Sequence, residues 1–249
     1  MALFEAHHLG KRFGDRVVLE DISLKFEAGQ LSGIMGPNGA GKSTCFNVLT
    51  GHFPPDRGHV LLNGEDITHA SARQIAQKGV ARSFQIISLF DDFSALENVI
   101  FALPAVRAMG FNMSHDVSRD SAIIDQALNV LEQVGLGANA DAQSSRLSYG
   151  ERRALEIAVA LAADPRILFL DEPTQGMGAS GRQLLLGLVQ QLKRKYTIVM
   201  IEHDMDFLFS LADQISVIHW GQVIAQGAPA ELRADPWVRR VNSEASAHA

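Results

Sequence analysis

The residues with the most specific chemistry form one glycine-rich segment that ends in a lysine and two hydroxyls. Residues 36–44 read Gly36-Pro37-Asn38-Gly39-Ala40-Gly41-Lys42-Ser43-Thr44 and fit the pattern G-x-x-x-x-G-K-(S/T). The glycines allow successive backbone N–H groups to point inward and form a concave anion site. Lys42 then reaches the β- and γ-phosphates of a nucleotide, and the Ser43 hydroxyl ligates Mg²⁺. The segment therefore predicts a phosphate-binding loop.

The elements on either side of this loop match the context that the chemistry needs. The hydrophobic run 31–35 predicts a buried strand, and 43–49 predicts the start of a helix. A helix N-terminus adds partial positive charge beside the phosphates. A glycine turn that contains Lys-Ser by chance would not combine this spacing with this context, so we favour the phosphate loop.

Two carboxylates supply a second part of the candidate site. Asp171 and Glu172 follow the apolar run 167–170, which predicts another buried strand. In a parallel sheet, ligands bind at the carboxyl ends of the strands. Asp171 is then placed to hold Mg²⁺ as the acidic partner of Ser43. Glu172 is placed to polarise the water that attacks the γ-phosphate. An N-cap role is the alternative for acids after a strand, and the phosphate loop makes it the weaker one.

Two further polar residues follow strand-like runs. Gln85 follows the run 80–84, and His203 follows the run 197–201. A neutral amide binds Mg²⁺ or the attacking water and releases it when a neighbouring element moves, and a histidine hydrogen-bonds the γ-phosphate. Taken alone, each residue could serve an ordinary structural role.

Residues 147–151 read Leu-Ser-Tyr-Gly-Glu and open a predicted helix. Ser148 is a credible N-cap, and Glu151 three residues later completes a capping box. The capping box alone accounts for these residue types, so the local pattern by itself does not indicate a function for the segment.

The order of apolar patterns predicts an α/β fold. Strands are expected at 2–7, 17–26 and 59–62, with turns at Gly10, Gly14 and Asn63-Gly64. Helices are expected from 94 to 163, with apolar spacing at Ile124, Leu128, Leu131 and Val134. Strands return at 167–170, 197–201 and 215–218, and a helix at 180–195 forms the crossover of a parallel βαβ unit. Residues 109–121 predict a loop or helical insertion, and the chain after 241 a frayed tail.

Composition narrows the class of protein. A net charge of −6 disfavours a general nucleic-acid binder, and 47% hydrophobic residues is ordinary for a globular protein. We expect no membrane-spanning segment and no leader peptide, and therefore a cytoplasmic protein unless a partner holds it at a membrane. Cys45 has no second cysteine to pair with, and helical packing is its expected role. The histidines lack metal-ligand spacing.

The ordered set of phosphate loop, Gln85, Leu-Ser-Tyr-Gly-Glu, Asp171-Glu172 and His203 resembles the nucleotide-binding subunit of ABC transporters over nearly the whole chain. The resemblance implies one ABC ATPase domain, 1–249, with a P-loop NTPase (RecA-like) core and a mainly parallel sheet. It places the catalytic core and an N-terminal antiparallel β subdomain in 1–85 and 164–249, and a helical subdomain in 86–163.

The resemblance also implies roles for single residues. Glu172, His203 and Gln85 would act in catalysis, and Ser43, Gln85 and Asp171 would hold Mg²⁺. ATP would contact residues 36–44, and Ser148 and Gly150 would contact the γ-phosphate bound to the opposite subunit. Phe13 would stack on adenine, although a core Phe on an edge strand is the plain alternative.

Four segments look more specifically like the ATPase of branched-chain amino acid importers: 81–90, 97–99, 201–205 and 227–236. The implied partners are transmembrane permease subunits, a second ATPase subunit (the same chain or a different one) and, indirectly, an external substrate-binding protein, with no nucleic acid. The implied location is the cytoplasmic face of the inner membrane, through the permeases.

The sequence departs from the family pattern at two places, and three other functions are alternatives to a branched-chain amino acid importer. Gly178 replaces an Asp that the family commonly carries after the catalytic Glu, and the ending 238–243 differs from the frequent Tyr-Leu-Gly type. An importer for urea, an amide or an organic acid is the runner-up. A soluble ABC ATPase acting on DNA or ribosomes lacks its expected coiled coil or second cassette. A non-catalytic scaffold would not need the intact site residues.

The segment 86–96 also predicts a partner site. It gathers Ile86, Ile87, Leu89, Phe90 and Phe93 beside Asp91 and Asp92 in a stretch too short to be a core helix of its own. Exposed apolar clusters rimmed by charge are typical of partner sites. We expect part of this cluster to line a groove for a short permease helix, although some of these side chains anchor the helical subdomain.

Overall fold

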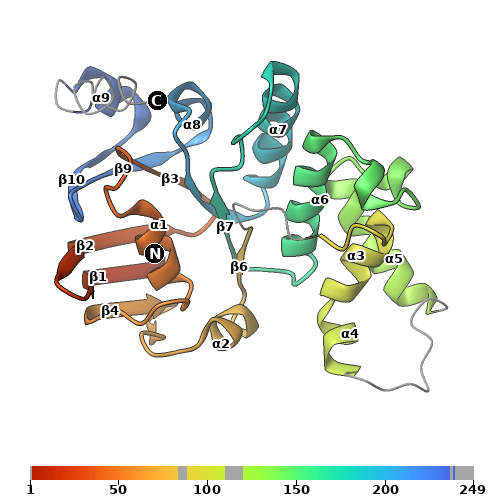
Figure 1. Cartoon of the computed structure of the whole chain (residues 1–249), viewed down its shortest axis with the longest axis horizontal. Coiled ribbons are helices and arrows are strands. Elements are labelled where there is room, and N and C mark those ends of the chain that lie inside the picture. The colour runs from red at the N-terminus through yellow and green to blue at the C-terminus, as the bar shows by residue number, and fades with distance from the viewer. Residues whose placement is uncertain (1, 84–88, 110–119, 236–237, 239–249) are drawn as a thin grey trace.

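The computed structural model of the chain describes residues 2–83, 89–109, 120–235 and 238 (Figure 1). Its centre is a ten-stranded sheet with the order β5-β4-β1-β2-β10-β9-β3-β8-β7-β6. The strands are β1 Ala2–Phe13, β2 Arg16–Glu27, β3 Leu31–Met35, β4 Arg57–Leu62, β5 Glu65–Asp66, β6 Val80–Arg82, β7 Ile167–Asp171, β8 Thr197–Ile201, β9 Gln214–His219 and β10 Gln222–Gly227. The helices are α1 Lys42–Leu49, α2 Ala72–Gln77, α3 Ala95–Ala102, α4 Pro104–Met109, α5 Ser121–Gln133, α6 Tyr149–Leu161, α7 Ala179–Leu192, α8 Met205–Leu211 and α9 Pro229–Ala234.

The strands β9, β3, β8, β7 and β6 run parallel and form the core of the sheet. Every residue of β3, β7 and β8 is buried, which explains why these strands read as continuous apolar runs rather than alternating ones. Along β7, Phe169 packs with Phe46 of α1, while Leu168 and Leu170 belong to the cluster that includes Leu155 of α6. Helices therefore cover both faces, as a parallel sheet requires.

The strands β5, β4, β1 and β2 pair antiparallel and form the N-terminal β subdomain. Asn63 (φ 51°) and Gly64 (φ 78°) form the turn of the β4–β5 hairpin, and Gly14 (φ 59°) lies in the turn between β1 and β2. The expected turn at Gly10 is wrong, because Gly10 lies within β1 and pairs with Arg57 of β4. Register shifts near Gly10 break the alternation of apolar residues, so the sequence pattern looks interrupted where the strand continues.

The helices α3, α4, α5 and α6 form a lobe to one side of the sheet, beyond β6 and α2 (Figure 1). Helix α5 buries Ile123, Ala127, Val130 and Leu131 within this lobe. The expected helical spacing is present, but Ile123 and Ala127 are buried in place of Ile124 and Leu128, which follow them and are only partly buried. Helix α7 forms the predicted crossover between β7 and β8. The tail after 241 and most of 109–121 lie outside the described residues.

None of the helices in the described parts of the chain is both long and apolar enough to span a membrane.

Candidate active site

The phosphate loop joins β3 to α1, as its sequence context predicts. Gly36 has a φ of 152°, and a Cβ there would lie 2.0 Å from the carbonyl oxygen of Ile218. Gly41 has a φ of 102°, and a Cβ there would lie 2.9 Å from the carbonyl oxygen of Val18. Both positions therefore need glycine for close backbone approach as well as for conformation. Neighbouring strands hold the loop in place from outside.

Lys42 lies buried at the start of α1, with its ammonium in the mouth of the loop. Its Nζ donates to the carbonyl oxygens of Gly36 (2.8 Å) and Pro37 (2.9 Å). Burial lowers the pKa of the Lys42 ammonium, while the charges of Glu172 and Asp171 raise it. The cation and the two carboxylates thus belong to one electrostatic unit, although 129 residues separate Lys42 from Asp171 in the sequence (171 − 42).

Asp171 ends β7 and is held by an arginine that the sequence analysis did not single out. Arg82, at the end of the adjacent β6, donates from Nη2 to Oδ2 of Asp171 at 2.7 Å. The other carboxylate oxygen, Oδ1, is buried and has no hydrogen-bond partner among the described residues. A buried, unpartnered carboxylate oxygen is a hard donor of the type that Mg²⁺ prefers. Asp171 and the hydroxyl of Ser43 are a fitting donor set for that ion.

Glu172 and His203 meet directly. The Nε2 atom of His203 lies 2.7 Å from Oε1 of Glu172. Glu172 adopts a left-handed backbone conformation (φ 46°), and its N–H donates to the carbonyl oxygen of Ile201 in β8. A non-glycine residue in this region is strained, and such strain concentrates at functional sites. The strained turn carries the Glu172 side chain to the end of β8, where His203 follows.

Glu202 is a second residue that the sequence analysis did not single out. Its buried carboxylate accepts from the backbone N–H groups of Thr174 (2.8 Å), His203 (2.9 Å) and Asp204 (3.2 Å). It therefore ties the segment after Glu172 to the segment that carries His203. An acid at the end of a buried strand is the only sequence signal for this role, and it does not reveal the partners.

Ser148 caps α6 in the predicted capping box. Its side chain accepts from the Glu151 N–H, and Oε2 of Glu151 accepts from the Ser148 N–H at 2.8 Å. The hydrogen bonds from Ser148 lower the pKa of the Glu151 carboxyl. Figure 1 places α6 in the helical lobe, apart from α1. Ser148 and Gly150 therefore belong to a different lobe from the phosphate loop of the same chain.

Tyr149 links this cap to the segment after the catalytic carboxylates. Its hydroxyl donates to the carbonyl oxygen of Gln175 at 2.8 Å. A Cβ at Gly176 would lie 3.1 Å from the same hydroxyl. Gly178 follows as the N-cap of α7, with open space around it.

Phe13 is not a core residue, because its side chain is 45% exposed. One edge packs against Phe53, with ring centroids 5.3 Å apart, and Nζ of Lys11 lies 5.6 Å from the ring centroid. The remaining surface of the ring is open to a ligand. Gln85, the last of the predicted site residues, lies outside the described residues.

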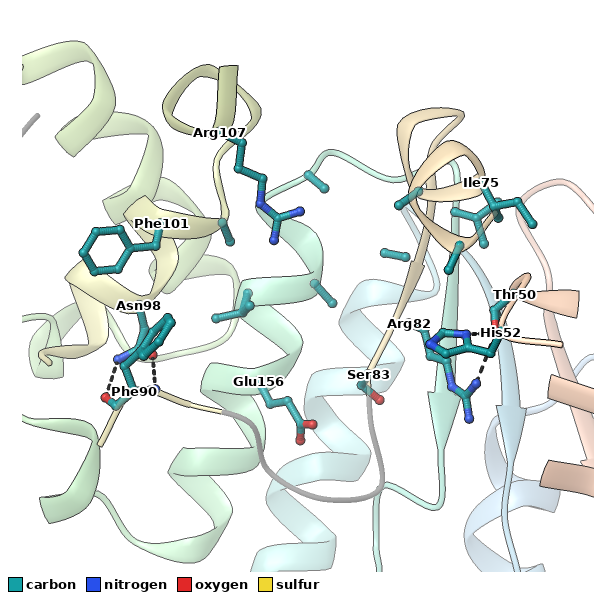
Figure 2. Close-up of a pocket in the computed structure, with 18 residues that line it drawn as sticks. Thr50, His52, Ile75, Arg82, Ser83, Phe90, Asn98, Phe101, Arg107 and Glu156 are labelled. Carbon is teal, nitrogen blue, oxygen red and sulfur yellow. Dashed lines mark hydrogen bonds between the residues drawn. The ribbon is translucent and has the colours of Figure 1, made fainter. Parts of the chain in front are cut away.

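A cavity of about 410 Å³ separates the sheet from the helical lobe. Figure 2 shows Phe90, Phe101 and Arg107 on one side of it and His52 and Arg82 on the other. We call this cavity the interlobe groove. Phe90 is 57% exposed, and its ring packs edge-on against Phe93 and Phe101, with centroids 5.6 and 5.9 Å away. Part of the predicted 86–96 cluster thus lines a groove, while Ile86 and Ile87 lie outside the described residues.

Comparison with known proteins identifies the family. The family model described as "ABC transporter" matches residues 19–175. The chain is 36% identical to the high-affinity branched-chain amino acid transport ATP-binding protein BraF of Pseudomonas aeruginosa, over 94% of each protein. It is 35% identical to the protein LivG of Escherichia coli K12, which has the same description, over 96% of each.

Solved structures agree with these relatives. An ATP-binding cassette of an ABC transporter, determined in its ADP conformation, matches with a TM-score of 0.87 at 27% identity. The match covers 97% of this chain and 98% of the other. The chain therefore belongs to the ATP-binding subunits of ABC transporters, which are ATPases.

Proposed function

We propose that this chain binds Mg²⁺–ATP with residues 36–44 and hydrolyses it to power an importer, with branched-chain amino acids as the cargo. The observation that carries the catalytic part is the convergence of Lys42, Asp171, Glu172 and His203 at the carboxyl edge of the parallel strands. Phe13 offers its exposed ring to adenine.

The metal would be held by Oδ1 of Asp171, the Ser43 hydroxyl and, outside the described residues, Gln85. When bound, Mg²⁺ neutralises charge on the β- and γ-phosphate oxygens. Lys42 adds a cation on the same phosphates from the mouth of the loop. If these groups hold the metal, nucleotide binding by the Asp171→Ala variant should no longer depend on Mg²⁺.

Glu172 accepts a proton from the attacking water, and His203 holds Glu172 in place and contacts the γ-phosphate. The 2.7 Å contact between the two side chains supports this division. His203 is more exposed than Glu172, with side-chain exposures of 41% and 11%. This difference suits a Glu that is kept from bulk water and a His that faces the incoming nucleotide.

The site is completed by a second subunit. Ser148 and Gly150 begin a helix in the other lobe, so a second ATPase chain packed against this one brings its own α6 N-terminus toward the γ-phosphate. That second subunit is a copy of this chain or a related ATPase. Closure of the two subunits on ATP and their opening after hydrolysis provide the motion that drives transport.

The interlobe groove receives a short cytoplasmic helix of a permease subunit. The backbone of Phe90 is fixed there by Asn98, whose Oδ1 accepts from the Phe90 N–H (2.9 Å) and whose Nδ2 donates to the Phe90 carbonyl (3.1 Å). The aromatic wall offers an anchor point, and Arg107 suits an acidic residue on the incoming helix. This docking holds the chain at the cytoplasmic face of the inner membrane.

The cargo is tested by reconstitution. The chain is assembled in proteoliposomes with permeases, a second ATPase and a binding protein from the same organism, and ATP-driven uptake of labelled leucine is compared with that of urea and an organic acid. We expect uptake of leucine, isoleucine or valine. Uptake of urea or the organic acid instead assigns the runner-up cargo. ATP turnover that no permease stimulates would contradict a role in transport.

A further inference from the structure

Arg82 connects the interlobe groove to the carboxylate that is proposed to hold the metal. Its guanidinium makes hydrogen bonds in two directions. Nη2 donates to Oδ2 of Asp171 at 2.7 Å, and Nη1 donates to Oδ1 of Asn47 at 2.7 Å and to Oγ1 of Thr50 at 3.1 Å. Two acceptors come from α1 and the residue that follows it, and the third comes from β7. One side chain thus fixes the sheet edge relative to the helix behind the phosphate loop.

The same residue lines the interlobe groove. Figure 2 shows Arg82 on the sheet side of the groove, beside His52 and Thr50. Its guanidinium carbon lies 5.7 Å from the centroid of the Phe46 ring. Both partners of the ion pair are buried, with side-chain exposures of 9% for Arg82 and 4% for Asp171. The pair is therefore weakly screened by water.

The position of the pair leaves one oxygen of Asp171 for a ligand. Arg82 occupies Oδ2, while Oδ1 is buried and, within the part of the chain that the structure describes, has no hydrogen-bond partner. A cation that holds one oxygen of a carboxylate fixes the direction of the other oxygen, and hydrogen-bond partners of this kind orient metal ligands. Arg82 is in this sense a positioning residue and does not itself touch the nucleotide.

We propose that Arg82 orients Asp171 for Mg²⁺ and transmits occupancy of the interlobe groove to that carboxylate. The second half rests on the proposed function, in which a permease helix fills the groove. A helix in the groove covers the 9% of the Arg82 side chain that is still exposed, and the loss of this remaining water strengthens the Arg82–Asp171 attraction. By linkage, the bound Mg²⁺–nucleotide then changes the affinity of the groove for the permease helix. The free energy of this change equals that by which the helix changes Mg²⁺ binding.

A simple structural ion pair is the competing explanation, because buried pairs also serve fold specificity. The chain contains a matched control for it. Arg153 donates to Glu156 at 2.6 Å within α6, and both side chains are buried. Glu156 lines the interlobe groove, whereas Asp171 is held by Arg82. Replacing Arg153 by Lys perturbs a comparable buried pair that includes a groove residue but not the proposed metal ligand.

The first experiment measures ADP binding by calorimetry to the isolated chain with and without Mg²⁺. For Arg82→Lys we expect the affinity gained from Mg²⁺ to fall by about 10–100-fold, the usual effect of losing an outer-shell partner. The affinity without Mg²⁺ stays unchanged, and Arg153→Lys keeps the full gain. An unchanged Mg²⁺ gain in Arg82→Lys, or an equal loss in Arg153→Lys, overturns the positioning role.

A second variant covers the case in which Arg82→Lys fails to fold, as judged by circular dichroism and thermal melting. Asn47→Ala removes one acceptor of the guanidinium and leaves the Asp171 contact in place. We expect a smaller loss of the Mg²⁺ gain in the same direction. No loss in Asn47→Ala, in a sample that melts cooperatively, overturns the proposal in that case.

The second experiment measures a change in the environment of the interlobe groove when Mg²⁺–ADP binds. A polarity-sensitive dye is attached to Ala76→Cys, an exposed groove position on α2. The native Cys45 stays unlabelled because burial raises the pKa of its thiol to about 12. Mg²⁺–ADP should shift the emission of the labelled chain, and Arg82→Lys should abolish the shift. No shift in the labelled parent chain overturns the transmission. Both experiments omit the permease, so a failure of permease docking leaves their outcomes unchanged.

Discussion

At the scale of single residues, the site combines a cation and two carboxylates that the fold brings together. Lys42 places its ammonium against the carbonyl oxygens of Gly36 and Pro37 and responds to the charges of Asp171 and Glu172. Its replacement therefore removes a positive charge from the place where the phosphates are expected.

For Lys42→Ala we expect ATP binding to weaken by about 10–150-fold, the equivalent of roughly 1.5–3 kcal/mol for a hydrogen bond to a charged group. Hydrolysis should disappear. Equilibrium binding of a fluorescent ATP analogue measures the first effect and phosphate release the second. Wild-type affinity together with wild-type turnover would remove Lys42 from its assigned role.

For Glu172→Gln we expect ATP to bind normally while hydrolysis falls by about 10²–10⁴-fold, because an amide keeps the shape of the side chain but accepts no proton. The hydrogen bond to His203 can persist through the amide oxygen. Single-turnover hydrolysis, with Lys42→Ala as the background control for contaminating ATPase, is the measurement. A rate within a fewfold of wild type would contradict the general-base assignment.

At the scale of elements, sequence patterns predict most of the architecture. The buried runs 31–35, 167–170 and 197–201 coincide with strands that are fully covered on both faces, where apolar content alone is a sufficient signal. The Gly10 turn was predicted wrongly because register shifts disturb the alternation in β1. Patterns in one segment do not reveal irregular pairing with another.

The parts of the site that the sequence does not predict are contacts across long sequence separations. Arg82 and Asp171 are 89 residues apart and meet only because β6 and β7 pair in parallel. Glu202 binds Thr174, 28 residues away, for the same kind of reason. The motif residues were recognised individually, whereas the side chains that hold them in place required the strand order.

Phe90 lies in the segment between β6 and α3. Phe90→Ala should leave ATP binding intact, because Phe90 lies on the groove and its backbone is held by Asn98. Association with the permeases should weaken by about 2 kcal/mol, a roughly thirtyfold loss for an aromatic anchor. Co-purification with the permeases and transport assays measure the effect.

Leu184→Ala serves as the control for Phe90→Ala. Leu184 is a large side chain on α7 that is more exposed than Phe90 and does not line the groove. Its replacement should affect neither association nor transport. Full assembly and transport by Phe90→Ala would place the permease interface elsewhere.

At the scale of the whole molecule, the separation of the lobes predicts that each site is shared by two chains. Ser148→Arg puts a bulky cation at the start of α6, in the helical lobe. We expect nucleotide binding by the mutant's own phosphate loop to be nearly normal and turnover in the partner's site to be lost.

Mixing Ser148→Arg with Lys42→Ala tests the shared site directly. A dimer with one defect on each chain keeps one intact composite site, so partial ATPase activity should return in the mixture. Each mutant alone is the control. Absence of any recovery would mean either that the sites are not shared or that the chain pairs with a different ATPase, and mixing with a related ATPase subunit from the same organism separates the two.

The hydroxyl of Tyr149 that binds the Gln175 carbonyl gives this mixing experiment an asymmetric counterpart. Tyr149 follows Ser148 at the helix start that is proposed to face a partner subunit, and its hydrogen bond reaches the backbone three residues after the chain's own Glu172. A substitution at Tyr149 in one chain should therefore impair both ATP sites of a dimer. In genetic terms, defects at Ser148 and Lys42 should complement each other, whereas a Tyr149 defect should complement neither of them.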